Sequence, residues 1–246
     1  MSLLSLRDGF GAAVFGARGG VGGALVRALC ADPRCAVVYA GARAGYAPAD
    51  QKVRPFTFDL LAEQSIASAA DSMIANGAVQ LVVVATGILH DATMTPEKTW
   101  RALSPEVLGR AFAINAIGPA LIAKHMLGRF PKNEKTVFAA LSARVGSISD
   151  NRLGGWHAYR ASKAALNMLV RNAAIELARS NRSSVCVTLH PGTVETPLSR
   201  PFQDGVRTGK LLTPDTSASH LLGVIDQLTP TQSGGLFAWN GQQIPF

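Results

Sequence analysis

Short apolar runs alternate with longer segments of helical periodicity along most of the chain. Leu81–Ala85 is apolar at every position, which is typical of a strand covered on both faces of a sheet. The predicted strands are Ala12–Phe15, Ala36–Ala40, Phe56–Phe58, Leu81–Ala85, Thr136–Leu141, Val185–Leu189 and Gly235–Trp239. The predicted helices are Val21–Leu29, Ala62–Asn76, Pro105–Leu127, His157–Ser180 and Ser217–Leu228. This alternation predicts an α/β fold, in which a parallel sheet carries helices on both faces.

Two segments depart from the regular pattern. Gly118 and Pro119 stand inside the predicted helix Pro105–Leu127, where they predict a kink. The segment Thr193–Thr213 has mixed polarity and is punctuated by Gly and Pro. It predicts a loop with short helices, of the kind that sets the choice of substrate. Since no linker stands out elsewhere, we expect residues 1–246 to form a single domain.

Composition supports a globular protein. The chain has 246 residues, of which 48% are apolar and 16% charged, so it can bury a large core. The formal net charge is +8, but Lys and Arg are scattered from Arg7 to Lys210 without a basic run. A nucleic-acid-binding protein needs its positive charge gathered on one face. We therefore expect no nucleic-acid partner.

The chain carries no sequence signal for export or for a metal. Its N-terminal apolar run contains Arg7 and Asp8, which argues against a signal peptide. No stretch approaches the roughly 18–20 uninterrupted apolar residues of a membrane span. The three cysteines, Cys30, Cys35 and Cys186, do not form a metal-ligand pattern. We expect reduced thiols in a cytoplasmic protein that binds neither a membrane nor a metal.

A glycine-rich turn joins the first predicted strand to the first predicted helix. It reads Gly16-Ala17-Arg18-Gly19-Gly20-Val21-Gly22. Free backbone N–H groups and the helix dipole make a helix N-terminus an anion site. Glycines let the backbone turn tightly and approach a pyrophosphate. In this position the turn predicts a dinucleotide cofactor.

The end of the second strand discriminates between cofactors. An acidic residue there would hold the ribose 2′-hydroxyl of NAD, but the chain reads Tyr39-Ala40-Gly41-Ala42-Arg43. Arg43, joined by Arg18 of the glycine turn, suits a 2′-phosphate. NADP(H) is therefore favoured, and NAD(H) is the alternative. Asp59 and Leu60 follow the third strand, where they predict either an adenine contact or, for Asp59, a helix N-cap.

Tyr159 and Lys163 lie four residues apart at the start of a long predicted helix. Residues at this spacing share one face of a helix. A tyrosine hydroxyl has an ordinary pKa near ~10, and a nearby ammonium group favours the phenolate and lowers that pKa. The pair is thus a candidate proton donor and acceptor in a chain that also predicts a dinucleotide site.

With these motifs in this order, the chain resembles the classical short-chain dehydrogenase/reductase family, and in particular its C-factor-like or sniffer-like carbonyl-reductase branch. The resemblance to the branch is carried by Ser142–Ile148 and by Tyr159–Asn167. It implies a single Rossmann-like, doubly wound domain with seven parallel strands in the order 3-2-1-4-5-6-7. It also implies an NADP(H)-dependent oxidoreductase that interconverts a small carbonyl compound and an alcohol, as a homodimer or homotetramer.

The resemblance also implies a role for individual residues. Tyr159 would be the general acid toward the carbonyl, and Lys163 would bind the nicotinamide ribose. Ser142 would hold the substrate oxygen, and Asn115 would anchor a proton-relay water. The residues implied at the cofactor are Gly16, Arg18, Gly19, Gly20, Val21, Gly22, Arg43, Asp59, Leu60, Ala85, Thr86, Gly87, Tyr159, Lys163, Pro191, Gly192, Val194 and Thr196.

Two stretches depart from the family pattern. The family's Asn-Asn-Ala-Gly after the fourth strand reads Val84-Ala85-Thr86-Gly87 here, so the bracing asparagines are missing. The second of the family's paired serines, which is the catalytic one, falls on Ala143. Ser142 is therefore the first candidate for the substrate serine and Ser147 the alternative.

Some alternatives remain open at this point. Trp156 and Phe202 are candidates for the wall of an apolar substrate pocket, with core packing as the other interpretation. His90 and His157 could also line that pocket, but the sequence assigns them no role. The alternative function is a cofactor-binding signalling or sensor protein of C-factor type with little turnover.

Overall fold

The computed structural model describes residues 2–47, 50–204 and 210–246. Its main sheet has eight strands in the order β10-β9-β6-β5-β4-β1-β2-β3. The strands are β1 Phe10–Phe15, β2 Cys35–Ala42, β3 Val53–Thr57, β4 Val79–Val84, β5 Thr136–Leu141, β6 Ser184–His190, β9 Leu236–Ala238 and β10 Gln243–Ile244. All pair in parallel except β10, which runs antiparallel to β9.

The α/β Rossmann-like fold is thus confirmed, including the predicted order of the first seven strands. The predicted number of strands is wrong by one. The eighth strand, β10, has only two residues, Gln243 and Ile244, and so short a strand leaves no periodicity in the sequence. It pairs with β9 because the chain turns back at Gly241, where φ is +82°.

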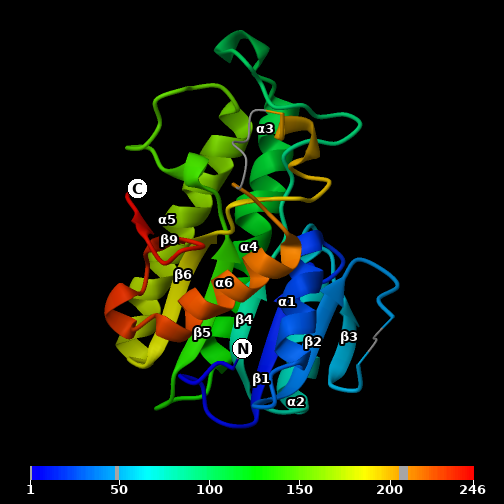
Figure 1. The fold of residues 1–246 in the computed structure, drawn as a ribbon, viewed down its shortest axis with the longest axis vertical. Helices are drawn as coiled ribbons and strands as arrows, with labels where there is room; N and C mark the ends of the chain where they lie inside the picture. The colour runs from blue at the N-terminus through cyan, green and yellow to red at the C-terminus, as the bar shows by residue number, and fades with distance from the viewer. Residues whose placement is uncertain (1, 48–49, 205–209) are drawn as a thin grey trace.

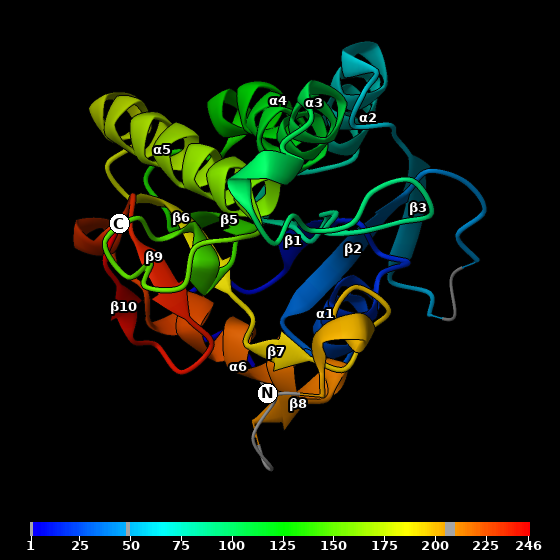
Figure 2. The ribbon, with the colours of Figure 1, turned by 90° about the horizontal axis from the view of Figure 1, so that it is seen from above.

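Helices cover both faces of the sheet, as Figure 2 shows. They are α1 Gly20–Cys30, α2 Glu63–Ala75, α3 Pro105–Phe112, α4 Gly118–Met126, α5 His157–Ser180 and α6 Pro214–Gln227. Helices α1 and α6 lie on one face, and α2, α3, α4 and α5 lie on the other (Figure 2). Each face buries its own apolar cluster against the strands. The near-continuous burial of β1, β4 and β5 follows from this double cover.

Helices α3 and α4 are one continuous run with an irregular turn between them. Residues Ala113–Ile117 form a π-helical turn, in which Gly118 N–H donates to the oxygen of Ala113. Pro119 contributes to the irregularity because it lacks the N–H that would bind the carbonyl of Asn115, four residues earlier. The helix is therefore irregular next to the predicted kink, with the π turn just before Gly118 and Pro119.

The run Pro105–Arg129 corrects one expectation from the sequence. With 25 residues and a mean hydropathy of 1.3, it is long and apolar enough to cross a membrane by length and composition. In the structure this run packs against α2, α5 and the sheet. Of its apolar window, 39% is buried inside the fold.

The substrate loop predicted over Thr193–Thr213 contains more regular structure than expected. Strand β7, Thr193–Val194, pairs with β8, Leu211–Leu212, in a separate two-stranded sheet. A short 3-10 helix, Arg200–Phe202, lies between them as predicted. Residues 205–209 of this loop lie outside the described part of the chain. The loop ends where Thr213 caps α6 by accepting from Thr216 N at 3.1 Å.

The carboxyl ends of the parallel strands point to one end of the molecule, at the top of Figure 1. The segments that follow β4, β5 and β6 gather there, beside the N-terminus of α5 (Figure 1). In open α/β sheets, ligands bind outside the carboxyl ends of the strands. This end therefore holds the candidate site.

Candidate active site

The glycine turn after β1 packs closely against its neighbours. Gly16 has a φ of +100°, and a Cβ added there would lie 3.0 Å from Thr86 Cγ2. A Cβ on Gly22 would lie 2.1 Å from the oxygen of Gly16, and one on Gly20 would lie 2.6 Å from Thr196 Cγ2. Only glycine fits at Gly16 and Gly22, since the obstructing atoms are backbone or the φ is positive.

The N-terminus of α1 is free to receive an anion. Its first turn has neither a capping side chain nor an acidic residue. Helix starts leave backbone N–H groups without partners, and these groups favour phosphate. The structure thus brings the glycine turn, the end of β4 and Thr196 to one place.

Arg43 directly follows β2, and Arg18 reaches the same turn. The guanidinium of Arg18 donates to the oxygen of Ala44 at 3.1 Å, the residue that follows Arg43. Both arginines are exposed. This geometry fits an anionic group placed beside the end of β2.

Asp59 is also exposed, at the turn that follows β3. Its carboxylate accepts from Leu61 N at 2.9 Å, whereas the N-cap of α2 is Ala62. The N-cap interpretation of Asp59 is therefore wrong, and the adenine contact stays a prediction. Leu60 lies under α4, where a Cβ on Gly118 would approach its Cδ2 to 2.6 Å.

Helix α5 carries Tyr159 and Lys163. Lys163 is 3% exposed and its Nζ donates to the oxygen of Leu141, at the end of β5, at 2.7 Å. The same Nζ lies 5.8 Å from the ring centre of Tyr159. The hydroxyl of Tyr159 makes no hydrogen bond within the described residues. The helix thus places a buried amine and a half-buried phenol side by side, with the phenol oxygen free for a substrate.

Burial governs the protonation of both groups in the protein alone. Loss of water raises the pKa of Tyr159 to about 12. Loss of water also lowers the pKa of Lys163 to about 7. The lowered tyrosine pKa expected from a charged lysine and a bound cofactor ring stays a prediction, and in the protein alone the direction is the opposite one. The reason is that burial penalises the charged form of both groups, so that the neutral phenol and the neutral amine are favoured together.

Asn115 lies in the π turn and is fully buried. Its Oδ1 accepts from Ile88 N at 2.8 Å, and its Nδ2 donates to the oxygen of Ile88 at 2.8 Å. The same Nδ2 donates to Ser162 Oγ at 3.0 Å, and that hydroxyl donates to the backbone oxygen of Tyr159. Asn115 therefore holds the exit of β4 against the helix that carries Tyr159.

Gly87 is where these groups converge. A Cβ there would lie 3.4 Å from Asn115 Oδ1 and 3.5 Å from Lys163 Nζ. The backbone of Gly87 is exposed. A flat group could therefore reach Lys163 past this glycine.

The two candidate serines are both buried but differ in their bonding. Ser142 Oγ donates its proton to Asn167 Oδ1 at 2.8 Å. Ser147 Oγ accepts from Asp150 N at 3.1 Å, and its proton has no acceptor within the described residues. Ser142 can thus accept a further hydrogen bond, whereas Ser147 can still donate one. The geometry leaves the choice between them to experiment.

The segment that follows β6 runs beside the glycine turn. Gly192 has a φ of +83°, and a Cβ there would lie 2.9 Å from Trp239 Cδ1. The backbone oxygen of Pro191 accepts from Ser217 Oγ at 2.8 Å, and Val194 is buried. This segment is held rigidly, with Thr196 facing Gly20.

Thr86, beside Ala85 at the end of β4, offers a polar atom to a bound group. Its Oγ1 is buried and has no hydrogen-bond partner in the part of the chain that the structure describes. A buried hydroxyl without a partner is costly. Together with the open start of α1, it makes the residues present fit a dinucleotide.

A second group of residues supports the site and was not found from the sequence. Glu97 accepts from Ala158 N at 3.2 Å and, through its backbone oxygen, from Trp156 N at 2.5 Å. Its carboxylate thus serves the first turn of α5, which has no capping side chain of its own. Gly146 allows close packing, since a Cβ there would lie 2.8 Å from Lys163 Cβ. In the sequence, the pair Gly154-Gly155 was the one indication that the backbone just before α5 adopts positive φ.

Comparison with known proteins identifies the family. The profile of the family described as short chain dehydrogenase matches residues 11–206. The C-signal protein of Myxococcus xanthus is 38% identical over 139 residues, which cover 56% of this chain and 78% of that protein. An uncharacterized oxidoreductase of Schizosaccharomyces pombe is 27% identical over 259 residues, which cover 95% of this chain and 96% of that protein.

Solved structures show the same fold. The NADPH-bound carbonyl reductase from chicken fatty liver matches with a TM-score of 0.82 and 25% identity, over 98% of this chain and 95% of that one. The carbonyl reductase Sniffer of Drosophila melanogaster matches with a TM-score of 0.80 and 21% identity, over 98% and 100% of the two chains. The chain belongs to the short chain dehydrogenase family and is an oxidoreductase with a Rossmann-type fold.

Proposed function

We propose that the protein interconverts a carbonyl compound and an alcohol with NADP(H), with Tyr159 as the acid and base. The proposal rests on one observation: the side chains of Asn115 and Lys163 both come close to Gly87. Lys163 lies one helical turn after Tyr159 on α5. NADPH, when bound, supplies the hydride. The protein's own residues supply orientation and the proton.

Tyr159 holds its proton firmly in the protein alone, because burial raises the pKa of its hydroxyl to about 12. A group that keeps its proton is ready to donate it to a carbonyl oxygen that gains negative charge. Lys163 would bind the ribose hydroxyls and, once charged, favour release of the tyrosine proton. Pro119 has no N–H to donate to the backbone carbonyl of Asn115. That carbonyl is suited to bind a water molecule that passes a proton back to Tyr159.

NADP(H) is preferred over NAD(H) in this proposal. Arg18 and Arg43 stand exposed at the end of β2, where two guanidinium groups favour a phosphate. The neighbour from chicken fatty liver is described as NADPH-bound. The remaining cofactor contacts are those that the family resemblance implies, from Gly16 to Thr196.

The direct test is consumption of NADPH, followed at its absorbance, with a panel of aldehydes, ketones and quinones. Turnover by the native protein should fall by at least about a hundredfold in Tyr159→Phe, since acid catalysis contributes roughly 10²–10⁴-fold. Ser142→Ala and Ser147→Ala, compared in the same assay, identify the serine that holds the substrate oxygen. NADPH binding without turnover on any carbonyl would contradict the proposal.

A second function is favoured by one observation, the 38% identity to C-signal. A signalling protein of that kind would bind the cofactor without needing turnover. In that case Tyr159→Phe would leave its biological activity unchanged, whereas a variant that loses NADPH binding would abolish it.

We also propose that the protein is a homo-oligomer in the cytoplasm. Helix α5 exposes Met168 and Ile175 on one face, at 62% and 47%, and Ile117 is 51% exposed on the neighbouring π turn. A second copy of the chain would bury this face. The three cysteines are free thiols, which fits a reducing compartment. The domain is taken as residues 1–246, with residues 193–213 as the segment that contacts the substrate.

A further inference from the structure

A row of aromatic rings extends outward from Tyr159. Trp156 meets Tyr159 edge to face, with ring centres 6.3 Å apart. Phe202 lies against Trp156 at 4.8 Å, and His90 meets Phe202 at 5.6 Å. Residues Trp156, Phe202 and His90 are called the aromatic wall below. They come from three separate segments, which follow β4, β5 and β6.

The wall is not ordinary core. Trp156, Phe202 and His90 are each only half-buried, although aromatic rings bury well when nothing prevents it. The core clusters of the sheet do not include them. Each ring therefore keeps part of its surface accessible, and the Trp156 ring does so next to the ring of Tyr159.

The backbone at Trp156 is held in an unfavourable conformation. Its φ of +51° is left-handed, and it follows Gly154 and Gly155 with φ of +63° and +65°. A bulky residue rarely adopts this region, and such strain is found where function requires it. Glycine would adopt this conformation without strain, so the tryptophan side chain is present here at a cost to the backbone.

Two contacts hold the wall in place. Trp156 N donates to the oxygen of Glu97 at 2.5 Å, which fixes the start of α5 to the segment after β4. His90 Nε2 lies 3.2 Å from the oxygen of Pro197 and 3.1 Å from that of Leu198. These contacts tie the segment after β6 to the one after β4, so Phe202 is presented to Trp156 by a connected frame.

The side chains of Trp156 and Phe202 carry no charge, although the exposed Arg200 stands two residues before Phe202. The carboxylate of Glu97, the nearest acid in this frame, is 5% exposed and faces Ala158 N. The accessible groups are ring faces and edges, which attract another ring in offset or edge-to-face contact. A neutral, flat substrate would be recognised here, whereas a small aliphatic one would touch little of the wall.

We propose that Trp156 and Phe202 determine specificity by packing against the ring of an aromatic carbonyl substrate whose oxygen lies at Tyr159. This inference rests on the proposed function and adds the substrate class to it. An aromatic contact of this kind, with the area that it buries, favours a ring by about tenfold.

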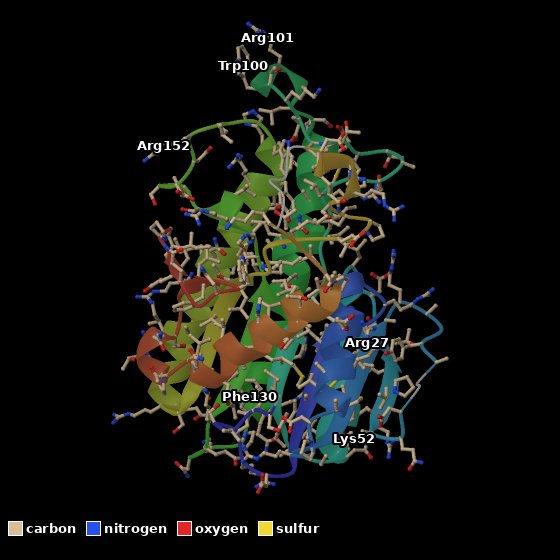
Figure 3. All side chains as sticks on the ribbon, viewed as in Figure 1. Arg27, Lys52, Trp100, Arg101, Phe130 and Arg152 are labelled. Carbon is tan, nitrogen blue, oxygen red and sulfur yellow. The ribbon has the colours of Figure 1, made fainter. Side chains whose placement is uncertain are left out.

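The test measures kcat/KM with NADPH for benzaldehyde and propanal in the full-length protein. Trp156→Gly removes the ring and keeps the left-handed backbone, Trp156→Phe restores a ring, and Phe202→Ala removes the partner. The control is Trp100→Ala, because Trp100 is 64% exposed and lies at the outer tip of the segment after β4 (Figure 3).

We expect a preference for benzaldehyde of about tenfold or more in the native protein. The preference should fall to near unity in Trp156→Gly and Phe202→Ala, and it should persist in Trp156→Phe and Trp100→Ala. Equal losses on both aldehydes would show a merely structural role and overturn the inference, as would an unchanged preference in Trp156→Gly.

A binding measurement separates this inference from the proposed function. Isothermal titration of benzamide and propanamide, which are not reduced, is carried out on the NADP⁺-loaded protein and on the protein alone. If benzamide binds more tightly than propanamide and this difference is lost in Trp156→Gly, the aromatic wall recognises a ring, even if neither aldehyde is reduced. Equal binding of the two amides overturns it, whatever the turnover.

Discussion

The side-chain nitrogen of Asn115 lies 3.0 Å from the hydroxyl oxygen of Ser162, so the π turn and α5 are joined beside Tyr159. The same amide pairs with Ile88 N and O. One buried side chain therefore connects a strand exit, an irregular turn and the helix of the candidate acid. Its loss should affect stability and catalysis together.

Asn115→Ala should lower the free energy of unfolding by about 2 kcal/mol, because it leaves the part-buried N–H and C=O of Ile88 without their present partners. Turnover should fall by more than about tenfold as Gly87 and Tyr159 lose their relative position. Denaturant unfolding and NADPH oxidation measure the two effects. Ser162→Ala, which leaves the pairing with Ile88 intact, is the control and should cost about 1 kcal/mol. Equal destabilisation by the two variants would contradict the proposed role of Asn115.

Lys163 should make stability depend on pH. Burial lowers its pKa from 10.5 to about 7, so between these values the unfolded chain binds more protons than the folded one. The contribution of Lys163 to the free energy of unfolding therefore rises with pH between about 7 and 10.5. The free energy of unfolding of the native protein, relative to Lys163→Met, should increase by about 2 kcal/mol from pH 7.5 to pH 9. Parallel pH curves for the two proteins would refute the depressed pKa.

Arg43→Ala and Arg18→Ala should weaken NADPH more than NADH. Each removes a charge-assisted contact with the 2′-phosphate, and we expect Kd for NADPH to rise by about tenfold or more while Kd for NADH changes little. Titration of both cofactors checks this. Arg27→Ala is the matched control, since Arg27 is an exposed arginine on α1 that pairs with Asp215 and lies away from the strand ends (Figure 3). A similar effect on both cofactors would remove the basis for NADP preference.

Gly146→Ala should impair catalysis by displacing Lys163. The added Cβ would lie 2.8 Å from Lys163 Cβ and 3.0 Å from its backbone carbon, so α5 would have to move. We expect kcat to drop by about tenfold, since small displacements of positioned groups are costly. Gly109→Ala is the control, because a Cβ there meets nothing within 4 Å and alanine favours the helix α3. An unchanged kcat would show that Lys163 tolerates the shift.

Ile175→Glu should reduce the size of the assembly. It places a charge on the exposed apolar face of α5, between two copies of the chain if they pair there. Size-exclusion chromatography with light scattering should then report a smaller particle than for the native protein. Leu4→Glu, at a residue that is 72% exposed elsewhere, should leave the size unchanged. A native protein that is already monomeric would refute the oligomer directly.

The regular elements could be predicted because burial on both faces leaves a plain sequence pattern. Thr136–Leu141 and His157–Ser180 were predicted with the bounds that the structure has. The third strand was predicted at Phe56–Phe58 but spans Val53–Thr57. Its exposed edge position gives only one fully buried residue, Val53, so the apolar signal came instead from the phenylalanines that pack on Phe15. Edge strands are where hydrophobic patterning is weakest.

The candidate site could be predicted only as far as short motifs extend. Tyr159 and Lys163 are linked by helical spacing, and Gly16 to Gly22 by a single turn. The contacts of Asn115 with Ile88 and Ser162 join residues 27 and 47 positions apart, and those of Glu97 with the start of α5 span 61. No local pattern encodes such pairs. Spacing also reveals the charge near Tyr159 but not the loss of water, which in the protein alone raises the tyrosine pKa.

Glu97 has a consequence for engineering. Its segment both completes the first turn of the helix that carries Tyr159 and holds Trp156 in the aromatic wall. Grafting the corresponding segment from a relative in order to change substrate range would therefore also alter the start of that helix. A change in substrate selectivity would therefore also change the rate. A graft that keeps a carboxylate at position 97 should change the selectivity and leave the start of α5 in place.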